Sequence, residues 1–186
     1  MAKKIYFIVS LLLFISCNET NHVRKYSIPK LTKTTIDTSN SVKSTTSTQF
    51  TWLAPEHWTL GKENSMRIGS YNIPYNDKLA DLSISYFKGD GGGLFQNINR
   101  WRGQLNLSNL TLQEINNLAI MGSSNIGRYK MFEIFNSIDT SRAFLCFVLS
   151  LDNSTLFLKL DCSKEGIDIL KEDLINFINT FQYINE

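Results

Sequence analysis

Alternating apolar and polar positions mark the strands of this chain. From Leu82 to Tyr86, apolar residues recur at every second position, which predicts a strand over 79–87 with one buried face. Similar runs bounded by turn residues predict further strands over 66–73, 128–135, 142–151 and 155–162, with turns at 74–77, 122–127 and 152–154. The segment 50–58 alternates like a strand until Pro55, which lacks an amide donor and ends the regular ladder.

Other segments repeat apolar residues at helical spacing. The stripe from Leu94 through Trp101 to Leu105 predicts a helix over 94–107 with Trp101 in the core, and a second stripe predicts a helix over 166–182. A capping box at 111–114 predicts a short helix over 111–119. This order of elements predicts a single α+β domain over 50–186, with a mostly antiparallel sheet flanked by helices.

The N-terminal pattern is typical of export. Two lysines precede an apolar run over 5–15, which is about half the length of a membrane-spanning helix, and Ser16-Cys17 follows. The pattern resembles the signal peptide of a bacterial lipoprotein and predicts a signal peptide over 1–16, with Cys17 lipidated in the cell envelope, at the periplasmic or outer face of a membrane. The alternative is a simple secretory signal, with Cys17 an ordinary cysteine.

The next segment, 17–49, is rich in Ser, Thr, Asn and Lys, and we expect a disordered tether. A short edge strand over 26–31 is the alternative. The formal net charge of +2 comes from Lys3 and Lys4 alone, and acidic residues outnumber basic ones by three from Phe50 onward. The domain therefore gives no charge argument for nucleic-acid binding.

Few residues suggest catalysis. Of the two histidines, His22 lies in the tether, so a histidine mechanism would need His57. No ligand spacing typical of zinc occurs, and Gly89-Asp-Gly-Gly-Gly93 lacks the residues of a nucleotide-binding loop. We expect no metal, no cofactor and no catalytic set. Because export permits disulfides, Cys146 and Cys162 on neighbouring strands are a possible pair, with inert core thiols as the alternative.

The most distinctive segment is Asn97-Ile-Asn-Arg-Trp-Arg-Gly-Gln104, which follows the glycine-rich turn. On a helix, Asn97, Arg100 and Gln104 share one flank, and Asp90 lies in the adjoining turn. These four residues are the candidate binding site. Boundary packing, with Arg100 fixing the turn through Asp90, is the alternative.

This segment resembles an uncharacterised family of exported, lipoprotein-like bacterial proteins. Further matches are Trp52 to Trp58, with a central proline, and Met66-Arg67. More loosely, the chain is similar to the PsbP and Mog1-like α/β/α sandwich, whose members mostly bind or assemble partners. The resemblance implies a fold and brings no catalytic residues.

The function expected from these observations is a membrane-tethered, non-catalytic binding or assembly module with an unknown protein partner. Two alternatives stay open. One is an envelope hydrolase that uses His57 or the acid pair Asp81 and Asp90, and the other is a small-ligand binder at the glycine-rich turn.

Overall fold

The computed structural model describes residues 50–184. The predicted signal peptide (1–16), the lipidation site Cys17, and the tether (17–49) with its alternative strand and His22 lie outside these residues. The described elements are β1 (Phe50–Thr51), β2 (Thr59–Leu60), β3 (Gly69–Tyr75), β4 (Lys78–Lys88), α2 (Leu94–Gly103), α3 (Leu112–Leu118), β5 (Ile120–Ser124), β6 (Gly127–Phe135), β7 (Ala143–Leu151), β8 (Ser154–Cys162), α4 (Lys164–Ile178) and β9 (Gln182–Tyr183).

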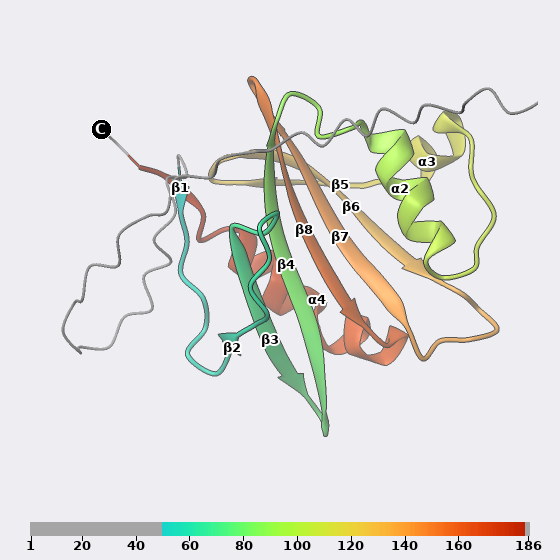
Figure 1. Ribbon diagram of the computed structural model, residues 1–186, viewed down its shortest axis with the longest axis horizontal. Coiled ribbons are helices and arrows are strands. Elements are labelled where there is room, and N and C mark those ends of the chain that lie inside the picture. Colours follow the sequence, from blue (N-terminus) through green and yellow to red (C-terminus); the bar gives the residue numbers. More distant parts are fainter. Residues whose placement is uncertain (1–49, 185–186) are drawn as a thin grey trace, which may run out of the picture. The chain divides into compact units, whose positions relative to one another are not determined.

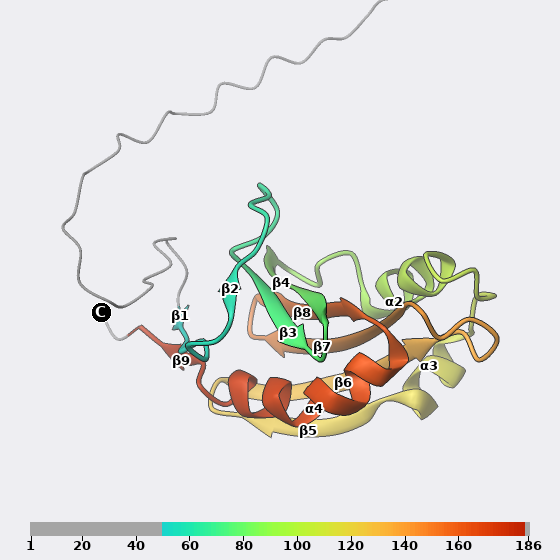
Figure 2. The ribbon, with the colours of Figure 1, turned by 90° about the horizontal axis from the view of Figure 1, so that it is seen from below.

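Seven strands form one antiparallel sheet in the order β2-β3-β4-β8-β7-β6-β5 (Figure 1). The predicted α+β class with a mostly antiparallel sheet is therefore confirmed. Figure 2 shows the sheet curling around α4, with α2 on the opposite side. We call the surface that faces α4 the inner face and the surface that carries α2 the outer face.

Alternation along the strands divides the core between the two faces. On β7, Leu145 and Phe147 pack in the inner cluster with α4, whereas Phe144 and Cys146 pack in the outer cluster. The outer cluster also holds Trp101, which is 5% exposed, so its predicted core position is confirmed. Helix α2 covers the outer face over β6, β7 and part of β8, and leaves the outer face of β3 and β4 without a helix (Figure 1).

Several boundaries differ from the prediction. The strand expected to end at Pro55 is shorter, with only Phe50 and Thr51 in the ladder, and a turn in which the Trp58 amide donates to the Pro55 carbonyl follows. Gly122 lies in a strand, β5, and the turn shrinks to the two residues between Ser124 and Gly127. The helices are shorter than expected. Helix α4 begins at Lys164 and ends at Ile178, and Gln182, the last residue of the predicted helix, begins the strand β9, which pairs with β1.

Candidate binding surface

The sheet register brings two carboxylates together on the outer face. Asp81 of β4 lies directly opposite Asp161 of β8, and their neighbours Leu82 and Leu160 point into the inner cluster. Like charges at directly opposed positions repel each other. The pair therefore needs compensating positive charge.

Each of these aspartates is held by an arginine. Arg67 donates from Nη1 to Asp81 Oδ1 and from Nη2 to Oδ2, both at 2.7 Å, and its Nη1 also donates to Ser70 Oγ at 2.9 Å. Arg142 donates from Nε to Asp161 Oδ1 at 3.1 Å and from Nη2 to Oδ2 at 2.7 Å. These hydrogen bonds raise the pKa of both guanidinium groups. Two-point pairing both neutralises each aspartate and fixes the orientation of the paired groups.

A lysine extends the same row toward α2. Lys159 lies two residues before Asp161 on β8, and its Nζ is 3.5 Å from the centroid of the Phe144 ring. The same Nζ donates to Gln104 Oε1 at 2.8 Å. Burial lowers the pKa of Lys159; Cys146 and the charge of Asp161 act in the opposite direction, and the charges of Arg142 and Arg100 lower it further. We call this row the polar strip: Arg67, Ser70, Asp81, Ser83, Arg142, Lys159 and Asp161.

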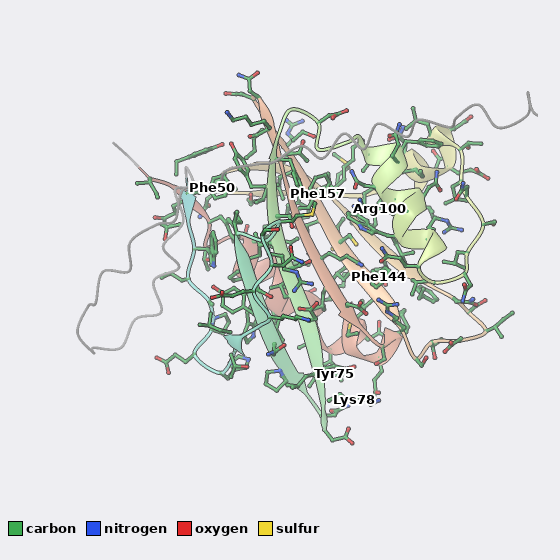
Figure 3. All side chains as sticks on the ribbon, viewed as in Figure 1. Phe50, Tyr75, Lys78, Arg100, Phe144 and Phe157 are labelled. Atoms are coloured by element: carbon green, nitrogen blue, oxygen red, sulfur yellow. The ribbon has the colours of Figure 1, made fainter. Side chains whose placement is uncertain are left out.

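The four candidate residues predicted from the sequence, Asp90, Asn97, Arg100 and Gln104, do not form one cluster. Gln104 contacts Lys159, and Arg100 is close enough for its charge to lower the pKa of that lysine. Figure 3 shows Arg100 at the border between α2 and the outer face. Arg100 and Gln104 therefore adjoin the polar strip. Asp90 and Asn97 instead belong to the glycine-rich turn.

Asn97 is the link between the turn and Arg100. Its Nδ2 donates to the carbonyls of Gly91 at 2.9 Å and Gly93 at 2.8 Å, and its Oδ1 accepts from Arg100 Nη2 at 2.8 Å. Asp90 Oδ1 accepts from the Gly92 amide at 3.0 Å. In the alternative of boundary packing, Arg100 would fix the turn through Asp90, whereas in the structure Arg100 reaches the turn through Asn97.

An open pocket of about 380 Å³ lies at the other side of the turn. The ten residues that line it are Gly89, Asp90, Leu94, Val148, Ser150, Leu151, Asp152, Asn153, Ser154 and Thr155. Thr155 Oγ1 donates to the Gly89 carbonyl at 2.9 Å, so one wall is tied to the turn. Of the four candidates, only Asp90 reaches this pocket.

The groups suggested for catalysis are dispersed. His57 is exposed and contacts Trp58 by its ring edge. Asp81 lies near the start of β4 and Asp90 lies beyond its end, so about 20 Å of extended strand separates them. Asp81 and Asp90 thus do not form an acid pair. No group of three or more metal-ligating side chains occurs within residues 50–184.

The possible disulfide between Cys146 and Cys162 is not formed, and both thiols are free and buried. The register explains this, because Cys146 pairs with Lys159 and Cys162 pairs with Ala143, three positions further along β8. Cys146 lies in the outer cluster and Cys162 in the inner cluster. Burial raises the pKa of Cys146, and raises that of Cys162 to about 12.

The sequence indicated Arg100 and Gln104 but not the strip beside them. Lys159 and Asp161 interrupt the apolar run of β8 after Thr155 at alternate positions, which was the available signal for a polar patch on one face. Their position opposite Asp81 depends on register, which the sequence did not specify. No helix within residues 50–184 has the length and apolar character needed to cross a bilayer.

Comparison with known proteins finds likeness at the level of structure. No family model and no curated protein matches the chain. It is similar to a Bacteroides thetaiotaomicron protein, at 19% identity over 74% of this chain and 46% of that one, with a TM-score of 0.44. The chain thus spans less than half the length of that protein.

Two shorter solved structures are also similar. Cyanobacterial PsbP (CyanoP) of Synechocystis sp. PCC 6803 is 11% identical, with 78% of this chain and 91% of that one covered and a TM-score of 0.48. LpqN of Mycobacterium tuberculosis, involved in cell envelope biogenesis, is 13% identical, with 73% and 83% covered and a TM-score of 0.46. A PsbP protein is thus among the structural neighbours of this chain.

Proposed function

We propose that the protein is a membrane-tethered binding module of the cell envelope that captures a protein partner on the polar strip and performs no reaction. The observation that carries this proposal is the pair of two-point arginine–aspartate contacts on a part of the sheet that no helix covers. Charges held in fixed positions favour specificity and orientation of a bound partner.

One side chain of each ion pair in the strip is largely accessible. The exposed fraction is 42% for the Asp81 side chain and 52% for that of Arg142. A partner can therefore reach both ion pairs without unfolding any element. The membrane tether rests on the sequence alone, through the apolar run and Ser16-Cys17.

The test is recovery of a partner from solubilised membranes with the tagged full-length chain. We expect a co-purifying protein that is lost when Arg67 and Arg142 are both replaced by Gln. Replacement of the exposed Lys62 and Arg128 by Gln is the matched control and should keep it. Equal recovery with both double variants, at equal amounts of folded protein, would contradict the proposal.

The proposed lipid anchor at Cys17 is tested separately. Mass spectrometry of the membrane fraction should find Cys17 as a lipidated N-terminus, and Cys17→Ser should release the protein from membranes. Retention of Cys17→Ser on membranes would remove the tether from the proposal and leave the binding surface to its separate test.

The pocket beside the glycine-rich turn supports a second candidate function. Its volume of about 380 Å³ is in the range of small-molecule sites, and Asp90, Asp152 and Thr155 offer polar groups in it. Ser150→Trp would fill this pocket. A small-ligand binder would lose its ligand in that variant while partner capture by the strip stays intact.

A further inference from the structure

We infer that Lys159 and Arg100 form a binding site for a single carboxylate of the protein partner, either an acidic side chain or a C-terminus. This inference rests on the proposed function and names the group that the strip recognises. Both cations lie at the border of the strip with α2, and within residues 50–184 neither forms an ion pair with a carboxylate.

The surroundings of Lys159 hold its ammonium group in place, and the charge of Asp161 raises its pKa without the two groups forming an ion pair. The Phe144 ring lies on one side at 3.5 Å, and Gln104 Oε1 accepts one hydrogen bond at 2.8 Å. Asp161 is the nearest acidic residue along β8, yet both of its carboxylate oxygens accept from Arg142. An ammonium group has three donors, so Lys159 keeps donors for a bound anion.

Arg100 supplies the second cation, and its position is set in advance. Its Nη2 donates to Asn97 Oδ1, and Asn97 is anchored by two hydrogen bonds to glycine carbonyls of the turn. A guanidinium group has five donors in a planar fork that matches the two oxygens of a carboxylate. One of these donors serves Asn97, so the others are available to a ligand.

The chemistry of the site favours a carboxylate over a phosphate. The cost of taking an anion out of water rises steeply with its charge, and Lys159 is half-buried beside an aromatic ring. Two carboxylates of the strip, Asp81 and Asp161, also lie along the same face. A carboxylate carries a single charge, so it costs less to take out of water than a doubly charged phosphate. It is also planar, so it can pair with Arg100 as Asp81 pairs with Arg67.

The test is an NMR titration of the purified full-length chain, with all lysine side chains observed together. The probe is N-acetyl-glutamate methylamide, and its neutral glutamine analogue is the matched ligand control. We expect the acidic probe to raise the pKa of Lys159 by about half a unit, because a bound anion favours the charged amine. The glutamine analogue should leave Lys159 unchanged, and the exposed Lys62 and Lys88 should not respond to either probe.

Two variants on the same helix assign the site. Arg100→Gln should weaken binding of the acidic probe about tenfold, the loss expected for one charge-assisted hydrogen bond. Arg102→Gln, which loses a bond from Nε to the Ser108 carbonyl and a favourable charge interaction with Glu114, should bind as the parent does. No response of Lys159 to the probe, or equal affinity in both variants, would overturn the site.

Inorganic phosphate is the competing ligand. Tighter binding of phosphate than of the acidic probe, at equal ionic strength, would overturn the assignment to a carboxylate. The proposed function is judged separately through Arg67 and Arg142. If the Arg67 and Arg142 double variant loses the partner but the pKa of Lys159 does not respond to the acidic probe, the proposed binding function stands and the carboxylate site at Lys159 and Arg100 is rejected.

Discussion

The residue with the most unusual environment on the outer face is Lys159. Burial lowers the pKa of its amine in the folded protein, so the unfolded chain binds that proton more tightly. Stability then rises with pH as the amine loses its proton, between the folded pKa and the usual value of 10.5. Below that window, the charged amine opposes folding.

Lys159→Met should therefore unfold at a higher temperature than the parent at pH 7, and the difference should shrink as the pH approaches 10. A methionine keeps much of the contact with Phe144 and removes the buried charge. Thermal unfolding at pH 7 to 10 measures this. A less stable variant at pH 7 would show that Gln104 and Phe144 offset the cost of burying the amine.

At the scale of elements, the glycine-rich turn depends on close approach at one position. A Cβ on Gly91 would lie 2.5 Å from Phe157 Cε2, whereas a Cβ on Gly89 would meet no atom within 4 Å. Both residues have a positive φ, at 61° and 70°. The two positions therefore separate the cost of the backbone conformation from the cost of crowding.

Gly89→Ala should cost about 1 to 2 kcal/mol of unfolding free energy, because alanine disfavours this backbone conformation. Gly91→Ala should cost about 1 to 3 kcal/mol more, because the buried Phe157 ring must move. Urea unfolding of both variants measures the difference. Equal losses would mean that the turn shifts without disturbing Phe157.

Elements whose signals are local were predictable. The capping box at Thr111 is present, with Thr111 Oγ1 accepting from the Glu114 amide and the Glu114 carboxylate accepting from the Thr111 amide. Strand β5 was missed because Gly122 and its serine neighbours have weak strand preference. It forms because β6 supplies a ladder and the Tyr129 ring occupies the space above Gly122.

In the candidate site, too, the local part was predictable from the sequence and the long-range part was not. Helical spacing alone placed Arg100 and Gln104 on one flank of α2, and both adjoin the strip. The strip itself joins residues from β3, β4 and β8 and from the segments just before β3 and β7. Which of these residues meet depends on the sheet register, and that depends on long-range packing.

For the described domain as a whole, the sheet separates two cores that hold one buried thiol each. We expect Cys146 and Cys162 to stay unmodified by iodoacetamide in the native full-length protein, because both are buried with raised pKa values. Both should be alkylated in guanidinium without any reductant, as read by mass spectrometry of their peptides. A peptide with the two cysteines linked would contradict the placement on opposite faces.

The pairing of β1 with β9 has a mechanical consequence. Phe50 is the first residue of β1, and its backbone partner is Tyr183 of β9, near the C-terminal end of the chain. Any pull from the preceding segment enters the domain at this two-residue ladder and at the Phe50 ring, which touches Tyr86 and Phe181. Neither β1 nor β9 belongs to the seven-stranded sheet. We therefore expect tension to separate β1 from β9 before it separates the strands that carry the polar strip.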